Sequence, residues 1–251
     1  MVPASVLAAF GARGVEPAPL PGGQGRTWLA GDVVLKPVDD DAEAAAVAAI
    51  AADLDAPGVR VARPVRAGDG GWVVDGWAAW HRLAGRHRPD WSAIVDAGIA
   101  LHATLAGVAV PPALARRTHP WAVADRAVWG ERPLPDDDDP TVAALLDGLP
   151  PAGPSQLVHL DLTDNVLFEP GLPPGVIDLS LYVRPPALAS AVVVVDAVAW
   201  HGAPLDLVAT VDRALLRRAT AFRLVTATLL GNSVAAAHRL SHDRLVGALL
   251  S

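Results

Sequence analysis

Residues 157–180 have the sequence LVHLDLTDNVLFEPGLPPGVIDLS, and this stretch decides the expected fold. Two short apolar runs, 166–168 and 176–177, are separated by a segment rich in Pro and Gly. Apolar runs joined by such turn residues predict a β-hairpin. Asp178 directly follows the second run, so we expect the hairpin to hold this carboxylate rigidly.

Three further polar residues lie just before the hairpin. His159 and Asp161 are spaced as His-x-Asp, and Asn165 follows four residues after Asp161. Together with Asp178 they place two carboxylates and a carboxamide at one edge, and such oxygen ligands suit Mg²⁺. Phosphoryl transfer needs a base that orients a hydroxyl and groups that hold the metal beside the phosphates. The stretch therefore indicates phosphoryl-transfer chemistry.

This arrangement resembles the catalytic and metal-binding loops of the aminoglycoside phosphotransferase and choline kinase family, distant relatives of the protein kinases. The family pattern is His-x-Asp, then Asn, then a strand that ends in Ile-Asp. The resemblance implies an α+β, two-lobed, protein-kinase-like fold. A small N-terminal nucleotide-binding lobe with an antiparallel sheet would cover residues 1–79. A mostly helical catalytic and substrate lobe would cover residues 80–251.

By the same resemblance, Asp161 is the catalytic base and His159 braces its loop. Asn165 and Asp178 are the expected Mg²⁺ ligands. The chain departs from the family in two places. Three residues separate Asp161 from Asn165, where the kinase pattern has four. Leu and Ser180 follow Asp178, where many relatives have an aromatic residue and Gly.

The single Lys of the chain is the next informative feature. Beside 19 Arg there is only Lys36, at the end of the run VVLK, which predicts a strand. A turn containing Gly23 and Gly25 lies shortly before it. Glycine loops let backbone amides approach phosphate, and a following Lys can pair with the phosphates. The resemblance extends to this segment, so Gly23, Gly25 and Lys36 are expected to bind the nucleotide.

The next two segments complete the expected nucleotide site. Residues 42–54 predict an Ala-rich helix, and Glu43 is the candidate partner for Lys36, as in kinases where a helix Glu fixes the strand Lys. A solvated acid in the first helical turn is the alternative. Residues 77–83 lie where the family has its inter-lobe hinge. Trp80 and Leu83 are therefore candidate residues lining an adenine ring.

The remaining pattern predicts mostly helices. Strands are expected at 59–61 and 72–74, and helices at 3–12, 92–106, 141–149, 187–201 and within 205–250. Arg213, Arg217, Arg218 and Arg223 are expected on polar helix faces. The four consecutive Asp within 135–140 predict a solvated loop, with attraction of a cationic substrate as the alternative.

Composition excludes several classes of function. The net charge is −7 with no basic stripe, so we expect no nucleic-acid partner. No Cys is present, which rules out disulfides and thiol chemistry. The N-terminal sequence makes a poor signal peptide, and the longest apolar run is too short to span a bilayer. We therefore expect a cytoplasmic protein without a membrane partner.

These observations favour an ATP- and Mg²⁺-dependent phosphotransferase that acts on a hydroxyl of a small molecule, such as an amino sugar, an aminoglycoside or a choline-like compound. A nucleotide-binding or interaction module without catalysis is one alternative, favoured by the shorter spacing after Asp161. A metal-dependent hydrolase that uses His159, Asp161 and Asp164 is the other. It would need further ligands from distant segments.

Overall fold

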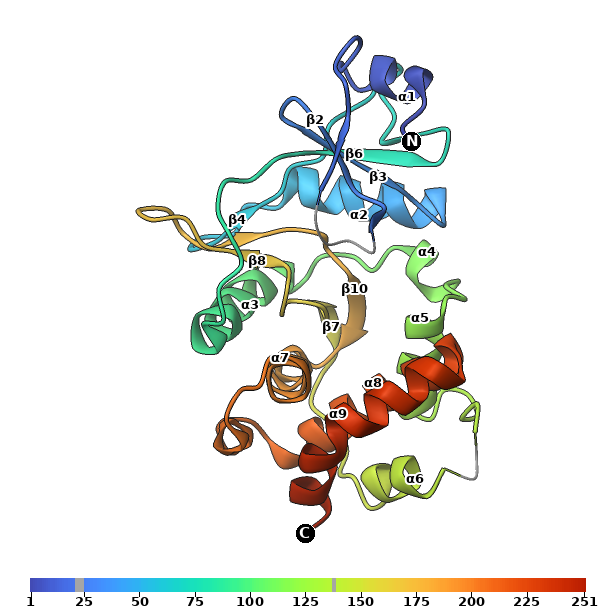
Figure 1. The fold of residues 1–251 in the computed structure, drawn as a ribbon, viewed down its shortest axis with the longest axis vertical. Helices are drawn as coiled ribbons and strands as arrows, with labels where there is room; N and C mark the ends of the chain where they lie inside the picture. The colour runs from blue at the N-terminus through green and yellow to red at the C-terminus, as the bar shows by residue number, and fades with distance from the viewer. Residues whose placement is uncertain (21–24, 137–138) are drawn as a thin grey trace. The chain divides into compact units, whose positions relative to one another are not determined.

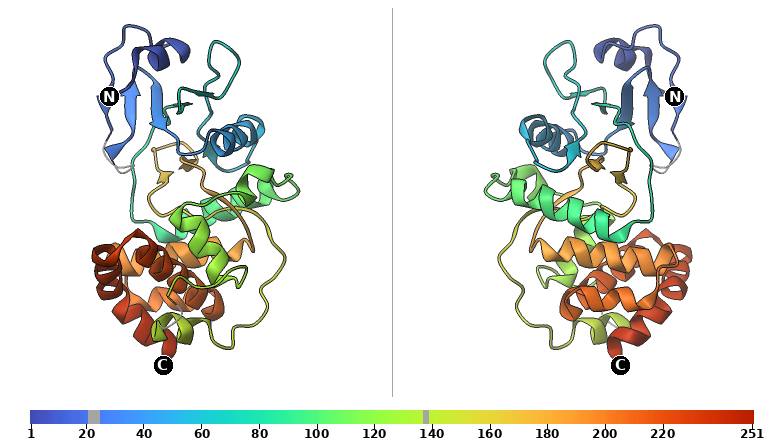
Figure 2. Two further views of the ribbon diagram at one scale, coloured as in Figure 1. Left: turned by 90° about the vertical axis from the view of Figure 1, so that its right-hand side faces the viewer. Right: turned by 90° about the vertical axis from the view of Figure 1, so that its left-hand side faces the viewer.

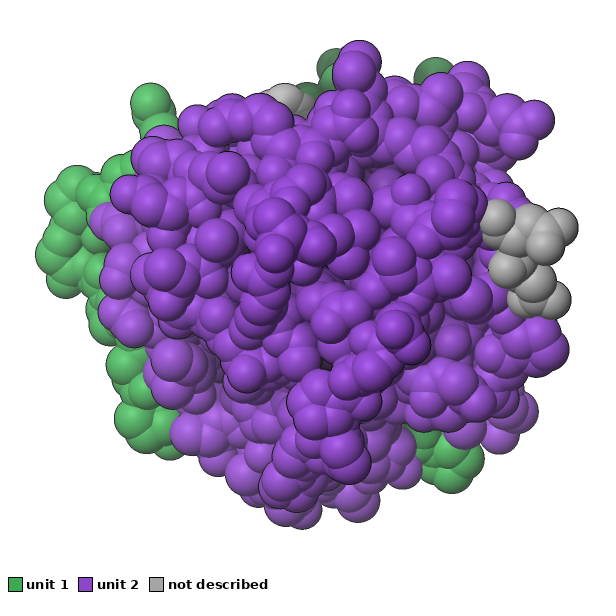
Figure 3. Space-filling model, turned by 90° about the horizontal axis from the view of Figure 1, so that it is seen from below, with its two compact units in different colours: residues 1–88, 111–114, 165–179 green, residues 89–110, 115–164, 180–251 purple. Residues whose placement is uncertain are grey.

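A computed structural model describes residues 1–20, 25–136 and 139–251 (Figure 1). The chain divides into two compact units, which Figure 3 colours separately. Unit 1 consists of residues 1–88, 111–114 and 165–179. Unit 2 consists of residues 89–110, 115–164 and 180–251. The segment around Asp178 thus belongs to the same unit as the N-terminal residues.

Unit 1 contains an antiparallel sheet with the strand order β1-β2-β3-β6-β5. Its strands are β1 (Ala18–Pro19), β2 (Trp28–Ala30), β3 (Val33–Pro37), β5 (Val73–Val74) and β6 (Trp77–His81). In β3 the side chain of Leu35 is fully buried, whereas the neighbouring Lys36 is partly exposed. Leu35 packs into a core with Val6 and Phe10, which come from α1 (Ala4–Ala9) and its end. The core thereby fixes the face on which Lys36 leaves the strand.

Helix α2 (Asp41–Asp53) is held at both ends by side chains of unit 1. The Asp40 carboxylate accepts a hydrogen bond from the Glu43 backbone N–H at 2.9 Å, which satisfies an otherwise unpaired donor. At the other end, Arg63 donates to the carbonyls of Ala51 and Ala52. Both contacts satisfy backbone groups that the helix itself leaves without partners.

The predicted hairpin is confirmed as β8 (Val166–Leu167) and β9 (Gly175–Val176), which pair antiparallel. The expected strand at 59–61 is β4 (Arg60–Val61), and it pairs parallel with β9 rather than joining the larger sheet. At Gly175 a Cβ would lie 3.0 Å from Arg60 Nη2 and 3.2 Å from Leu83 Cδ1. A larger residue would require the side chains of Arg60 and Leu83 to shift, so glycine suits this close approach of the three segments.

Unit 2 is mostly helical, with one two-stranded antiparallel sheet of β7 (Gln156–His159) and β10 (Leu181–Arg184). In this sheet His159 pairs with Leu181. The longer helices can be followed in the two side views of Figure 2. They are α3 (Trp91–Leu105), α5 (Pro120–Val128), α6 (Pro140–Leu146), α7 (Ala187–Trp200), α8 (Arg213–Leu230) and α9 (Asn232–Leu250). Leu205–Thr210 form a 3-10 helix. In the sequence the short helix α4 (Pro112–Ala115) follows α3, and its residues 112–114 belong to unit 1.

Helix α7 is the centre of unit 2. It packs against α3, α8 and α9, and the run Val192–Val195 is fully buried within it. β-branched residues favour strands by themselves, but burial on several sides selects the helix here. Gly231, with φ +117°, separates α8 from α9. The expected helices at 187–201 and within 205–250 are confirmed.

The N-terminal antiparallel sheet and the C-terminal helices confirm the α+β class that the sequence predicts. Among the described helices, none combines the length and the apolar character needed to cross a bilayer.

Candidate functional site

Lys36 and Asp178 form the clearest charged contact among the predicted site residues. Lys36 Nζ lies 2.7 Å from Asp178 Oδ1 and 2.5 Å from Asp178 Oδ2. Lys36 comes from β3, and Asp178 lies two residues beyond the end of β9. Both side chains are partly exposed, at 35% and 47%, so solvent and other ligands can reach them. Unit 1 therefore brings a single cation and a single carboxylate together from distant parts of the chain.

The backbone of Asp178 has an unusual conformation. Its φ is +50°, in the left-handed region that residues other than glycine rarely adopt. Asp tolerates this region better than most residues because its short side chain can hydrogen-bond locally. Left-handed residues of this kind are enriched at functional sites, where the surrounding structure maintains the strain. The chain bends at Asp178, two residues beyond β9.

Asn165 lies at the same end of the hairpin as Asp178. Its carbonyl accepts a hydrogen bond from Ile177 N–H at 3.0 Å, which places Asn165 beside the residue that precedes Asp178. No group of three or more His, Cys, Asp or Glu suitable for a metal occurs among the described residues. A carboxylate and a carboxamide still fit Mg²⁺, which is commonly held by one or two protein oxygens together with substrate phosphates.

Asp161 belongs to unit 2 and lies on the loop that follows β7. Its Oδ1 is 3.2 Å from Nη2 of Arg223, a residue of α8. The Asp161 side chain is 53% exposed, whereas the Arg223 side chain is only 5% exposed. The expectation that Arg223 lies on a polar helix face was wrong. The helical periodicity of the sequence cannot show that the buried carboxylate of Asp196 pairs with this guanidinium.

His159 is fully buried at the end of β7. Its Nδ1 accepts a hydrogen bond from the Asp161 N–H at 3.4 Å and from the Ser180 N–H at 3.2 Å. The imidazole thus joins the loop that carries Asp161 to the residue just before β10. This is the geometry that a bracing role requires, since it restrains the backbone of Asp161 itself.

His102, for which the sequence favours a packing role in its helix, contacts the backbone of His159. Its Nε2 accepts a hydrogen bond from the His159 N–H at 3.0 Å, and the side chain is buried in α3. Burial, and secondarily the nearby His159, lowers the pKa of His102 to about 4. The ring is therefore neutral at neutral pH and can remain an acceptor. The only available signal was a polar residue on the apolar face of an expected helix.

The other predicted nucleotide residues are distributed over unit 1. Gly25 is exposed with φ +71°, as a tight turn requires, and Gly23 lies outside the described residues. Trp80 lies in β6, half-buried, and pairs with Val34 of β3. Glu43 lies in the first turn of α2. The roles of these residues toward a nucleotide remain predictions.

Within the acidic loop, Asp136 is exposed as expected, whereas Asp139 is not. Asp139 is 5% exposed, accepts hydrogen bonds from the first backbone amides of α6 and forms an ion pair with Arg239. Burial by itself would raise the pKa of Asp139, but Arg239 and the amides together lower it. Asp137 and Asp138 lie outside the described residues. At least Asp139 is therefore structural.

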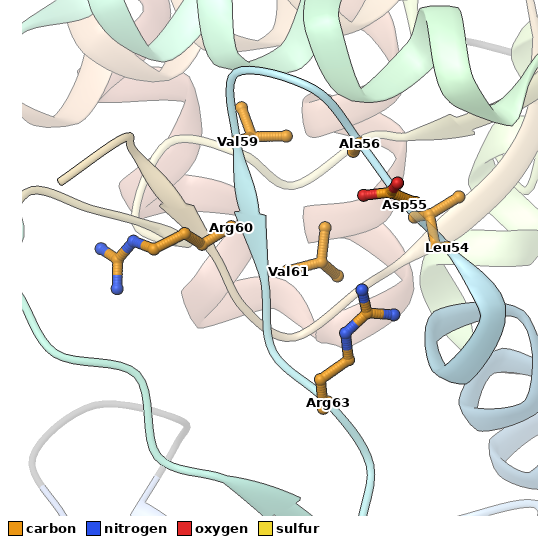
Figure 4. Close-up of a pocket in the computed structure, with 7 residues that line it drawn as sticks. All are labelled: Leu54, Asp55, Ala56, Val59, Arg60, Val61 and Arg63. Atoms are coloured by element: carbon orange, nitrogen blue, oxygen red, sulfur yellow. The ribbon is translucent and has the colours of Figure 1, made fainter.

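A cavity of about 280 Å³ in unit 1 follows the end of α2 (Figure 4). Its lining consists of Leu54, Asp55, Ala56, Val59, Arg60, Val61 and Arg63. Arg60 donates to the carbonyls of Pro173 and Ala84, and Arg63 donates to the end of α2. These cations are occupied by backbone groups, and none of the predicted site residues lines the cavity. We assign it a structural role.

The fold is similar to that of several solved phosphotransferases. A thermostable mutant of aminoglycoside phosphotransferase APH(4)-Ia is 17% identical, with a TM-score of 0.60 over 93% of this chain and 94% of that one. Spectinomycin phosphotransferase APH(9)-Ia, in complex with ADP and spectinomycin, is 14% identical, with a TM-score of 0.58 over 98% and 92%. Aminoglycoside 2'-phosphotransferase-IIIa, in its GDP complex, is 13% identical, with a TM-score of 0.55 over 93% and 93%. These similarities show the fold. No curated protein matches the chain significantly.

A family model described as the phosphotransferase enzyme family matches residues 18–224, which is most of the chain. The match includes β3 with Lys36, the loop of Asp161 and the segment of Asp178. It confirms the resemblance that the sequence motifs indicated. The chain belongs to the phosphotransferase enzyme family, as a small-molecule kinase with a protein-kinase-like fold.

Proposed function

We propose that the protein transfers the γ-phosphate of ATP to a hydroxyl group of a small molecule and requires Mg²⁺. The main support is the contact between Lys36 and Asp178, which brings together the cation expected to bind phosphate and the carboxylate expected to bind the metal. Solved proteins of similar fold bind ADP or GDP, which supports a nucleotide as the donor.

Residues 1–79 would supply the nucleotide lobe. Lys36 would contact the phosphates, while Gly23 and Gly25 would let backbone amides approach them. Glu43 would orient Lys36. Trp80 and Leu83 would line the adenine ring, with the hinge backbone as hydrogen-bonding partner.

Asp178 and Asn165 would hold the metal. Bound Mg²⁺ neutralises charge on the phosphate oxygens and favours their alignment for transfer. The hairpin of β8 and β9 fixes both ligands at one end, so their separation does not depend on a flexible loop. The left-handed backbone of Asp178 is part of the same arrangement.

The chemical step would depend on Asp161 in the lobe formed by residues 80–251. Asp161 would orient the acceptor hydroxyl and take its proton as the new bond from oxygen to the γ-phosphorus forms. The bond from that phosphorus to the bridging oxygen breaks, and ADP leaves. His159 would hold the loop through its two backbone hydrogen bonds.

A cationic acceptor suits the charge of this loop. Asp161 and Asp164 have side chains that are 53% and 69% exposed, and the chain carries a net charge of −7. We therefore propose an acceptor with amino groups, such as an amino sugar, an aminoglycoside or a choline-like compound. Such a cation would be attracted to the exposed carboxylates.

Thermal unfolding tests the nucleotide site first. ATP at about 100 times its dissociation constant should stabilise the protein by about 2.7 kcal/mol when Mg²⁺ is present. Asp178→Asn should lose the Mg²⁺-dependent part of that shift. No shift with ATP or GTP would contradict the proposal.

Acceptor screening then separates an enzyme from an inactive module. Phosphate transfer from ATP should be measured with hygromycin B, spectinomycin, kanamycin and choline as acceptors, and with water. A protein that binds MgATP but transfers phosphate to none of them would be the catalytically inactive nucleotide-binding module. The shorter spacing between Asp161 and Asn165 is the observation that favours this second candidate.

A further inference from the structure

We propose that Arg223 is a positioning residue that fixes the orientation of Asp161, and that the buried carboxylate of Asp196 in turn fixes Arg223. The inference rests on the proposed role of Asp161 as the base. It gives Arg223 of α8 and Asp196 of α7 a role in the reaction.

The contacts form a continuous chain from the core to the base. Arg223 Nε lies 2.8 Å from Asp196 Oδ1, and Arg223 Nη2 lies 2.5 Å from Asp196 Oδ2. The same Nη2 is 3.2 Å from Oδ1 of Asp161. One guanidinium nitrogen therefore joins a buried carboxylate to the exposed one.

A second contact from Asp196 reaches the same loop. The hydroxyl of Thr163 donates to Asp196 Oδ2 at 3.1 Å, and Thr163 is buried. Asp196 thus holds the loop at two places, directly at Thr163 and through Arg223 at Asp161. A single contact would let the loop rotate about its own axis. The two contacts, at Asp161 and Thr163, restrict that rotation.

The two inner members of the network are almost completely shielded from solvent. The side chains of Arg223 and Asp196 are 5% and 1% exposed. Burial by itself would lower the pKa of Arg223, but Asp196 and Asp161 together outweigh it and raise that pKa, so the guanidinium stays charged. Arg223 also lies over the ring of Trp200, with its Cζ 5.2 Å from the ring centroid. Packing and charge therefore restrict this side chain to one position.

The geometry requires arginine rather than any cation. The planar fork of a guanidinium can make two bonds to Asp196 and still direct a donor toward Asp161. A lysine ammonium can pair with Asp196. It cannot make two parallel bonds to Asp196 and at the same time donate to Asp161. Replacement by lysine should keep the buried charge compensated and lose the alignment of Asp161.

Steady-state kinetics of Arg223→Lys is the direct test, with the best acceptor from the screen above or with water. We expect kcat to fall by about 100-fold, the cost typical of a misplaced catalytic group, while KM for MgATP changes little. The stabilisation by MgATP should persist. If Arg223→Lys retains the wild-type kcat, the inference is wrong.

A matched control distinguishes positioning from simple loss of an ion pair. Arg184 makes the same two-bond contact with Asp125 inside unit 2, and both side chains are at most 10% exposed. The other contacts of Arg184 are with Glu131 and with the ring of Trp129, not with the loop that carries Asp161. Arg184→Lys should destabilise unit 2 to a similar degree without the drop in kcat. An equal drop in both variants would show that the effect is structural.

A variant that removes both buried charges distinguishes a loss of positioning from a failure to fold. Arg223→Met alone would leave Asp196 buried without a counter-ion, which is strongly destabilising. The double variant Arg223→Met with Asp196→Leu replaces the pair by apolar side chains, which is often tolerated. It should fold and still show the reduced kcat. A folded double variant with full activity would overturn the inference.

A double-mutant cycle shows whether Arg223 acts through Asp161. In an Asp161→Asn background, Arg223→Lys should have no further effect on the residual rate, because the aligned carboxylate is already gone. Independent, multiplying effects would contradict the proposed path. Failure of the wild type to transfer phosphate to any acceptor or to water would instead overturn the proposed function, and the inference with it.

Discussion

Lys36 contacts both carboxylate oxygens of Asp178, although 142 residues separate the two in the sequence. The ammonium therefore lies where a metal ion bound by this carboxylate would have to approach. If Asp178 holds the metal as proposed, Lys36 and Mg²⁺ would compete for its carboxylate. Phosphate groups would relieve this competition by giving Lys36 another anionic partner.

The first prediction concerns metal binding without nucleotide. Lys36→Met removes the competing cation, so binding of Mn²⁺, as a probe for Mg²⁺, should strengthen by up to about tenfold; partial exposure limits the effect. Binding of MgATP should weaken in the same variant, because the phosphates lose their cation. Isothermal titration with Mn²⁺ and with MgATP measures both changes.

Arg26 offers a matched control for the Lys36 variant. It forms an exposed ion pair with Asp39 at 3.1 Å in the same unit. Arg26→Met changes the net charge by the same amount but should leave Mn²⁺ binding unchanged. Unchanged or weaker Mn²⁺ binding to Lys36→Met would contradict the competition between Lys36 and the metal.

The second prediction separates chemistry from nucleotide binding. Asp161→Asn keeps the size of the side chain and removes the proton acceptor, so transfer should fall by at least about 100-fold. Stabilisation by MgATP should remain, because Lys36 and Asp178 are unchanged. Asp96→Asn, at an exposed position of α3, is the charge-matched control and should retain full activity. Equal activity of the two variants would exclude Asp161 as the base.

The sequence identified some charged residues of the site, but it could not show which residues contact one another. Lys36 and Asp178 could be selected because a lone Lys and an acid after a hairpin are visible as patterns. Arg223 could not, because its helical position matches a solvated arginine until Asp196 is known to lie beside it. The run Val192–Val195 shows the same dependence on context. These residues favour a strand by themselves, but the packing of α7 against its neighbours makes the run helical.

Gly98 illustrates another feature that depends on three dimensions, and it gives the third prediction. A Cβ at this position of α3 would lie 2.5 Å from Cδ1 of Leu162, which directly follows Asp161 and is 1% exposed. Leu162 has little space to move, so Gly98→Ala should displace the loop beside Asp161. We expect lower kcat and a net loss of stability, although alanine favours helices over glycine by about 1 kcal/mol.

Gly247 in α9 is the control for this substitution. A Cβ there would meet no atom within 4 Å. Gly247→Ala should therefore raise the free energy of unfolding by up to about 1 kcal/mol and leave kcat unchanged. Chemical denaturation and kinetics of both variants check the prediction. A stabilised and fully active Gly98→Ala protein would show that the loop adapts to the added methyl group.

The final prediction concerns acid stability, and its sign follows from His102. Burial lowers the pKa of His102 to about 4 in the folded protein, against about 6.5 when unfolded. Between these values the unfolded chain binds more protons, so this group makes the protein less stable as the pH falls from about 6.5 to 4, by at most about 3 kcal/mol.

His102→Gln retains an acceptor for the His159 N–H without a titrating ring. Its denaturation midpoints should fall less steeply over this pH range, whereas His87→Gln, at an exposed position, should follow the wild type. Identical pH dependence of His102→Gln and wild type would show that His102 is not a buried neutral acceptor.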